Sequence, residues 1–240
     1  MTTDIRLITF DLDDTLWDNF PVMMRAENIV YQRLCEYWPD VEQHFDFKGV
    51  ITFRRQLMGQ RSDLKMRITA LRHYSLTQVL ISIGCPETRA GKIASSVMEE
   101  FMHWRHEVDY FPDTEAVLAQ LSKHYKIGAV TNGNVDIKRL PVGRYFDFAI
   151  RAEEYNSEKP EPTLFLKALE MSGAEPGQTL HVGDCLNADV SGARALGINT
   201  AWFNPGQKDL PPEHQPDVVI RSLTELLDFL GINPSVAETG

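Results

Sequence analysis

The chain has 240 residues, of which 43% are hydrophobic and 24% charged, so it can form one large or two smaller globular domains with a substantial core. The net charge of −10 argues against a nucleic-acid partner, because a phosphate backbone demands a basic surface. Because the sequence shows no apolar leader and no window of about 18 apolar residues, we expect a cytoplasmic protein with no membrane partner.

The three cysteines, Cys35, Cys85 and Cys185, are odd in number, widely spaced and without a C-x-x-C pair. This pattern favours neither disulfides nor a zinc site. We therefore expect three buried thiols that pack as small apolar side chains.

The first predicted strand lies in the stretch L-I-T-F-D-L-D-D-T-L at residues 7–16, where a short apolar run stops at three acids. Asp11 and Asp13 are two residues apart on an extended backbone, so their carboxylates start on the same face. Two carboxylates held together repel unless a cation lies between them or one holds a proton. We expect both a magnesium ion and a shared proton here, although the letters alone also fit an acidic turn.

Helical patterns follow without a strand until about residue 111. Apolar residues recur at helical spacing over 22–37, with Pro39 ending the run. The further predicted helices are residues 47–58, a helix opened by Ser62 that breaks near His73-Tyr74 before reaching 83, and residues 86–108. In a parallel α/β unit, one crossover helix should follow the first strand. Here several helices follow instead, so we assign residues 17–111 to a helical insertion.

Repeated strand and helix units follow the insertion. We expect helices at 113–124, 162–171 and 190–196, strands at 126–131, 148–150, 179–182, 199–203 and 218–220, and a last helix opened by a capping box at Ser222–Glu225 and ended by Gly231. This alternation predicts an α/β fold, a parallel three-layer αβα sandwich formed by residues 1–16 and 112–232. Residues 233–240 are expected to be a flexible tail.

Polar residues follow several of the predicted strands, at the sheet edge where open α/β folds bind ligands. Thr131 and Asn132 precede Gly133, a combination suited to phosphate oxygens, although N-G is also a common turn. Lys159 stands before a proline, and Asp184 and Asp189 follow an apolar strand. Each alone also fits an ordinary surface lysine or helix cap, but together they converge on one pocket.

Four stretches of this sequence resemble, in the same order, the four motifs of the haloacid dehalogenase superfamily of phosphohydrolases. They are D-L-D-D-T at 11–15, Thr131-Asn132, Lys159-Pro160 and Gly183-Asp184 with Asp189. The resemblance covers nearly the whole chain. It implies a Rossmann-like core with the helical insertion as a cap domain. In that family the dehalogenases proper lack an acid at the place of Asp13, so this residue points to phosphatases or phosphomutases.

The resemblance also implies roles for the acids. Asp11 becomes the nucleophile that forms an aspartyl phosphate, and Asp13, kept protonated by its acidic surroundings, serves as general acid and then as general base. Mg²⁺ is expected to be held by Asp11, the backbone carbonyl of Asp13 and Asp184. Asp189 would hold a water ligand or orient its neighbours.

The remaining candidates bind or orient the substrate. Lys159 is expected to offset the charge of the acids and the phosphoryl group, while Thr131 and the Asn132 amide position its oxygens. Trp17 directly follows the acidic loop, where it either stacks on a planar substrate or packs in the core. The insertion carries four arginines, Arg54, Arg55, Arg61 and Arg67. They either form a solvated helix face or contact polar parts of the substrate.

The predicted substrate is a small phosphomonoester, bound by a monomer or homodimer. The stretches W-D-N-F-P at 17–21, N-G-N at 132–134 and Y-F-D-F at 145–148 with Arg151-Ala152 resemble bacterial phosphatases for flavin mononucleotide and for a phosphoribitylamino-uracil of riboflavin synthesis. Phosphatases of nucleotides, sugar phosphates or phosphoglycolate are the alternative among hydrolases. A phosphomutase and a non-catalytic module that binds phosphate esters are further alternatives.

Overall fold

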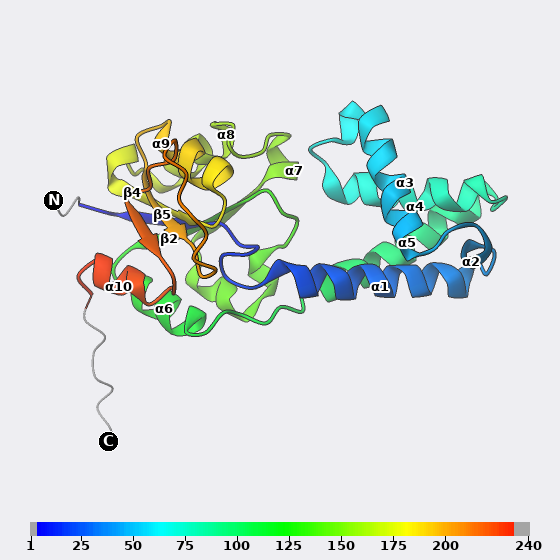
Figure 1. Cartoon of the computed structure of the whole chain (residues 1–240), viewed down its shortest axis with the longest axis horizontal. Coiled ribbons are helices and arrows are strands. Elements are labelled where there is room, and N and C mark those ends of the chain that lie inside the picture. Colours follow the sequence, from blue (N-terminus) through cyan, green and yellow to red (C-terminus); the bar gives the residue numbers. More distant parts are fainter. Residues whose placement is uncertain (1–3, 233–240) are drawn as a thin grey trace, which may run out of the picture. The chain divides into compact units, whose positions relative to one another are not determined.

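The computed structural model describes residues 4–232, so the predicted tail at 233–240 lies outside the described residues. The chain divides into two compact units, which are drawn in Figure 1. The first unit consists of the segments up to Asp18 and from Asp109 onward, and the second is Asn19–Val108. The segment predicted as an insertion, 17–111, therefore contains a helical unit that is two residues shorter at its start and three at its end.

The first unit is built on a six-stranded sheet in which every neighbouring pair is parallel. The strands are β1 (Leu7–Phe10), β2 (Lys126–Thr131), β3 (Phe148–Arg151), β4 (Thr179–Gly183), β5 (Asn199–Phe203) and β6 (Val218–Ile220). Their order is β3-β2-β1-β4-β5-β6, so the chain reverses direction across the sheet beside β1. That reversal is where doubly wound sheets open a crevice for ligands. All six predicted strands are confirmed to within one residue.

Helices flank the sheet on both sides, which confirms the Rossmann-like three-layer prediction. They are α6 (Thr114–Leu121), α7 (Ala152–Tyr155), α8 (Thr163–Ser172), α9 (Gly192–Arg194) and α10 (Glu225–Phe229). Figure 1 shows α8 and α9 on one side of the sheet and α6 and α10 on the other. On the first side, Phe165 of α8 and Ala193 of α9 share a buried cluster with Ile150 of β3. Burying apolar side chains on both faces explains why the strands are nearly continuous apolar runs.

Three helical details of the first unit differ from the prediction. The segment expected as a helix at 190–196 is a π-helical turn, η5 (Leu186–Ser191), followed by the single turn of α9. The capping box before α10 is also wrong, because the Glu225 N–H donates to the Ser222 carbonyl rather than to its hydroxyl, over 3.3 Å. The Ser222 hydroxyl instead meets Thr224 Oγ1 at 2.7 Å. Short 3₁₀ turns η2 (Ile137–Arg139), η3 (Pro141–Tyr145) and η4 (Pro176–Gln178) were not predicted.

All the regular elements of the second unit are helices, joined by short loops. Its elements are α1 (Asn19–Tyr37), α2 (Val41–His44), α3 (Phe47–Gln60), the 3₁₀ turn η1 (Ser62–Leu64), α4 (Ile68–Ser82) and α5 (Glu87–Arg105). The predicted break near His73-Tyr74 is wrong, since α4 runs unbroken through it, and Ser62 opens η1 rather than the long helix. A core contributed by α1, α4 and α5, including Leu34, Leu80 and Phe101, holds the unit together.

A buried charge cluster lies inside this helical core. Glu27 of α1 accepts a hydrogen bond from Arg54 Nη2 at 2.5 Å and another from Arg72 Nη1. The Arg72 guanidinium also lies over the Phe101 ring, 3.9 Å from its centroid. Arg54 is therefore an interior partner of Glu27, so the reading that places it on a solvated face is wrong, whereas Arg55 and Arg67 are exposed, as that reading expects.

The cysteines are free thiols, and Cys35 and Cys85 are buried as predicted. Cys185 is exposed, which corrects the prediction that it is buried. Its position two residues after the end of β4 places it at the sheet edge rather than in the core. Among the described residues, no helix is both long and apolar enough to cross a membrane.

Candidate active site

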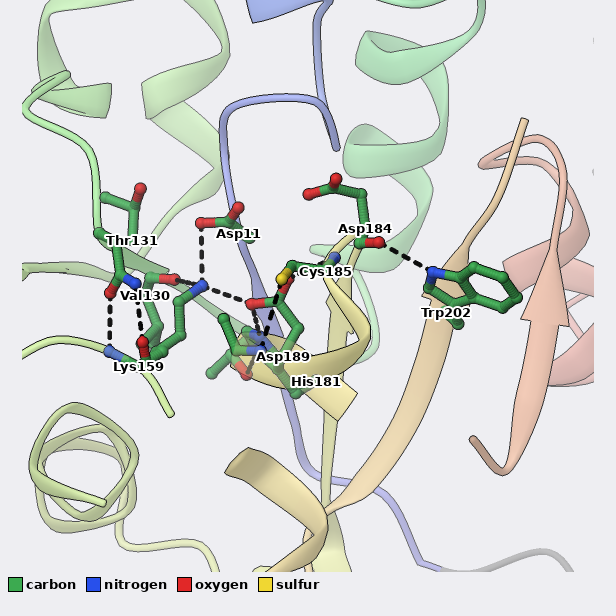
Figure 2. Close-up of polar contacts among 12 residues, drawn as sticks. Asp11, Val130, Thr131, Lys159, His181, Asp184, Cys185, Asp189 and Trp202 are labelled. Carbon is green, nitrogen blue, oxygen red and sulfur yellow. Dashed lines mark hydrogen bonds and ion pairs between the residues drawn. The ribbon is translucent and has the colours of Figure 1, made fainter. Parts of the chain in front are cut away.

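One cavity of about 280 Å³ lies beyond the carboxyl ends of β1, β2 and β4. Parallel pairing places the ends of β2 and β4 on either side of the end of β1, because Phe10 is in register with Ala129 and with Val182. Seven of the eight predicted site residues line the cavity, all except Trp17: Asp11, Asp13, Thr131, Asn132, Lys159, Asp184 and Asp189. Figure 2 shows how several of these side chains approach one another.

Asp11 is the first residue beyond β1. Its backbone N–H donates to the Val182 carbonyl at 2.9 Å, which continues the ladder between β1 and β4 by one residue. Its carboxylate is only 13% exposed, and Oδ1 lies 2.9 Å from Lys159 Nζ. Burial raises the pKa of Asp11 from 3.8 to about 7, against the opposing effect of the Lys159 charge, while Asp189 adds to the rise. This carboxylate therefore needs positive charge nearby to remain ionised at neutral pH.

Lys159 is the buried counter-charge of the site, with its side chain 1% exposed. Its ammonium donates to the Val130 carbonyl at 2.7 Å and to Asp189 Oδ1 at 2.6 Å, besides its ion pair with Asp11 (Figure 2). Burial alone would lower the pKa of Lys159, but the Asp11 and Asp189 carboxylates outweigh it and raise the pKa. The lysine is thus a fixed cation shared by two acids.

Asp189 is held by donors on both of its oxygens. Besides the bond from Lys159, Oδ2 accepts the Cys185 N–H at 2.9 Å. Burial alone would raise the pKa of Asp189, but the Lys159 ammonium and the His181 ring hold it well below its usual range. The close approach requires a glycine at 183, because a Cβ there would lie 2.2 Å from Asp189 Cγ.

His181 was missed by the sequence analysis. It lies in β4, buried and in register with Thr9 of β1, and its Nδ1 is 2.8 Å from the Thr9 hydroxyl. Its Nε2 is 3.1 Å from Asp189 Oδ1. Burial lowers the pKa of His181, so the ring is neutral, and the network assigns the proton to Nε2. Two polar residues at matching positions of neighbouring apolar strands were the available signal.

The Asn132 side chain holds the backbone of Lys159. The Asn132 side-chain amide donates to the Lys159 carbonyl at 2.9 Å, and its Oδ1 accepts the Lys159 N–H at 2.8 Å. Thr131 ends β2, and its hydroxyl accepts the Gly133 N–H at 3.0 Å. The side chain of Asn132 therefore orders the lysine segment, and only its backbone amide remains as the predicted contact to a phosphoryl oxygen.

Trp17 does not line the cavity. Its side chain is fully buried, and Nε1 donates to Asp13 Oδ1 at 3.0 Å. Of the two predicted roles, the structure supports packing and not stacking on a substrate, because neither ring face is open.

Comparison with known proteins agrees with this geometry. A family model described as haloacid dehalogenase-like hydrolase matches residues 5–197. The chain belongs to this family. The predicted superfamily is therefore confirmed, together with the assignment of the chain as a hydrolase.

Two relatives and two solved structures illustrate the family. The 5-amino-6-(5-phospho-D-ribitylamino)uracil phosphatase YigB of Escherichia coli is 32% identical, over 86% of each chain. The glyceraldehyde 3-phosphate phosphatase of Pyrococcus furiosus is 28% identical over 94% of this chain and 93% of the relative. The crystal structure titled 2-haloacid dehalogenase from Pseudomonas syringae is 36% identical with a TM-score of 0.89, covering 95% of this chain and 98% of that one. A phosphatase structure from Thermococcus onnurineus is 26% identical with a TM-score of 0.66, covering 95% and 98%.

The donor set of this family member fits a hard divalent cation. One carboxylate oxygen from each of Asp11, Asp184 and Asp189 lies within 4.8 Å of the others. Burial, with Asp189 and Asp14 nearby, raises the pKa of Asp184 from 3.8 to about 6. Oxygen ligands and uncompensated repulsion between carboxylates are what Mg²⁺ would satisfy and relieve. Because Asp189 already accepts from three donors, Asp11 and Asp184 are the better ligands of the three.

Proposed function

We propose that this hydrolase is a magnesium-dependent phosphomonoesterase that works through an aspartyl phosphate on Asp11. The observation that carries the proposal is the meeting of Asp11, Lys159 and Asp184 at one sheet edge, with Asp13 lining the same cavity. The phosphatase names of the relatives described above support it.

In the first step, an Asp11 carboxylate oxygen attacks phosphorus and the ester P–O bond breaks. Asp13 gives its proton to the departing oxygen, so the alcohol leaves as a neutral molecule. In the second step, water attacks the same phosphorus while Asp13 takes one of its protons. The bond between Asp11 and phosphorus then breaks, which restores the carboxylate and releases inorganic phosphate.

The other residues hold charge and position. Lys159 partly offsets the charges of Asp11 and Asp189 before the substrate enters, and it lines the cavity in which the phosphoryl group would bind. Thr131 and Asn132 line the same cavity, and we expect the Thr131 hydroxyl and the Asn132 backbone amide to orient the phosphoryl oxygens. In phosphoryl transfer, positioning and fixed charge supply most of the rate enhancement, so a buried, immobile lysine suits the task.

Asp11, Asp184 and the backbone carbonyl of Asp13 would hold the Mg²⁺ ion. When bound, the ion offsets the charge that gathers on the phosphoryl oxygens and keeps the Asp11 carboxylate ionised. Asp189 orients this set indirectly, through Lys159 and the Cys185 N–H.

The substrate proposal is a small cytoplasmic phosphomonoester, with a riboflavin-pathway intermediate or flavin mononucleotide first. It is supported by the similarity to YigB, whose name gives the phosphoribitylamino-uracil as its substrate. The helical unit Asn19–Val108 is the proposed cap that selects the organic part of the ester.

A 2-haloacid dehalogenase is the second candidate, because the similar crystal structure from Pseudomonas syringae carries that title. Displacing halide from carbon would also use Asp11 as nucleophile. A halide ion needs no proton to leave, however, so Asp13 would have no task in that first step. We expect no halide release from 2-chloropropionate.

A phosphate-release screen tests the proposal. The wild-type protein with millimolar Mg²⁺ is incubated with p-nitrophenyl phosphate, flavin mononucleotide, the phosphoribitylamino-uracil and glyceraldehyde 3-phosphate. We expect release that EDTA stops and that Asp11→Asn abolishes. Asp228→Asn, an exposed acid in α10, is the matched control and should retain full activity. Turnover by Asp11→Asn would refute the assigned nucleophile, and halide release without phosphate release would favour the dehalogenase.

A further inference from the structure

The loop after β1 connects the acid Asp13 to a buried indole. Asp13 lines the catalytic cavity, whereas Trp17, four residues later, lies outside it. Trp17 Nε1 donates to Asp13 Oδ1 at 3.0 Å, although the indole itself is fully buried. The loop thus reaches back to the side chain of its own acid through this hydrogen bond.

Trp17 is fixed by its own loop and by one segment that is distant in sequence, Tyr110–Phe111. Its carbonyl accepts the Asp14 N–H at 2.8 Å, which closes the loop. The backbone of Trp17 also forms an antiparallel bridge with Tyr110, and the Phe111 N–H donates to the Leu16 carbonyl at 2.9 Å. The two rings of Trp17 and Tyr110 pack edge to face, with centroids 6.2 Å apart. An indole held in this way can impose its own orientation on a flexible carboxyl group.

The direction of the hydrogen bond matters for proton transfer. An indole N–H only donates, so the Asp13 oxygen that faces it must act as acceptor. The proton that Asp13 gives to a leaving group then sits on the other oxygen, Oδ2. A carboxyl group free to rotate would present either oxygen, whereas a fixed one presents the same oxygen in every turnover.

We propose that Trp17 is a positioning residue for Asp13, which fixes the carboxyl oxygen that donates the proton to the leaving group. The inference rests on the proposed phosphatase function, in which Asp13 is the acid. It replaces the predicted stacking of Trp17 on a substrate by a role inside the catalytic loop.

Leaving-group chemistry separates this role from simple packing. The ratio kcat/KM covers steps up to the first irreversible one, the transfer of phosphorus to Asp11 with loss of the alcohol. A nitrophenolate leaves without a proton, whereas an alkoxide must be protonated as it departs. Misplacing the acid should therefore lower kcat/KM for an alkyl phosphate and spare it for p-nitrophenyl phosphate.

The experiment compares both esters in three variants of the full chain. Trp17→Phe removes the N–H and keeps an aromatic ring. Site-specific replacement of Trp17 by benzothienylalanine removes only the N–H, and it keeps the test decisive if the phenylalanine variant does not fold. Trp38→Phe is the matched control, because the Trp38 N–H has no hydrogen-bond partner within the described part of the chain.

We expect kcat/KM for glycerol phosphate to fall roughly 10-fold or more in both Trp17 variants, since general acids contribute about 10²- to 10⁴-fold. For p-nitrophenyl phosphate it should change less than about twofold, and Trp38→Phe should match the wild type on both esters. Equal losses on the two esters, or no loss on either, would overturn the inference. Failure of the wild type to hydrolyse either ester would instead refute the proposed function itself.

Discussion

Gly183 is the residue whose replacement tests the catalytic network most directly. It ends β4 and faces Asp189, and a Cβ at this position would lie 2.2 Å from Asp189 Cγ and 2.4 Å from Oδ2. Carbon atoms in contact normally lie at least about 3.5 Å apart, so Gly183→Ala must push the Asp189 carboxyl back by more than about 1 Å. The neighbour that must give way is a buried side chain in the centre of the site.

The displacement has a calculable consequence for Lys159. Its ammonium donates to Asp189 Oδ1 at 2.6 Å, and an added shift of about 1 Å takes this bond beyond normal hydrogen-bonding distance. The ammonium is then left with Asp11 and one carbonyl. We expect the free energy of unfolding to fall by about 1 to 3 kcal/mol, from overpacking and a weakened buried bond. Misplacement of the lysine should lower kcat/KM about 100-fold.

The assay combines thermal unfolding with phosphate release for Gly183→Ala and a glycine control. Gly91→Ala lies in α5, where nothing lies within 4 Å of the added Cβ. Alanine is the better helix former, so this control should be about 0.5 to 1 kcal/mol more stable and fully active. If Gly183→Ala keeps both the wild-type Tm and the wild-type kcat/KM, the placement of Asp189 does not control the site.

Three further predictions concern charge. Mg²⁺ at millimolar concentration should raise Tm by relieving carboxylate repulsion, as measured by differential scanning fluorimetry, and an unchanged Tm would count against a metal site. Lys159→Met should abolish turnover and destabilise the fold by about 3 to 5 kcal/mol in urea unfolding, because Asp11 and Asp189 lose their buried partner; a variant of wild-type stability would contradict this. The third prediction concerns Glu27: burial alone would raise its pKa, but Arg72 and a second guanidinium lower the pKa below the ordinary 4.5. A lowered pKa stabilises the fold above the unfolded value, and this stability is lost as pH falls through the folded value. The Tm advantage of wild type over Glu27→Gln should therefore shrink below about pH 4.5, and parallel Tm curves would disprove it.

Much of the fold was predictable because each strand carries its own signal. A strand of the parallel sheet is buried on both faces, so β1, β2 and β4 appear as apolar runs that stop at polar residues. The site residues that follow them were predictable for the same reason, since parallel strands bring their carboxyl ends to one edge. The short helices were less predictable. The turn η5 and the single turn of α9 carry too few residues for a periodic pattern.

The sequence by itself therefore determined the individual strands, the helical insertion, and the acids and lysine at the sheet edge. Each of these depends on a local hydrophobic pattern. Only the tertiary structure decided which partners meet. Trp17 binds Asp13 instead of a substrate, His181 joins Thr9 to Asp189, and Arg54 lies inside the helical unit with Glu27. The Thr9–His181 and Glu27–Arg54 contacts join segments that are distant in sequence, and no local pattern encodes their approach. Trp17 is only four residues from Asp13, but its ring packs on the distant Tyr110, which the local sequence does not reveal.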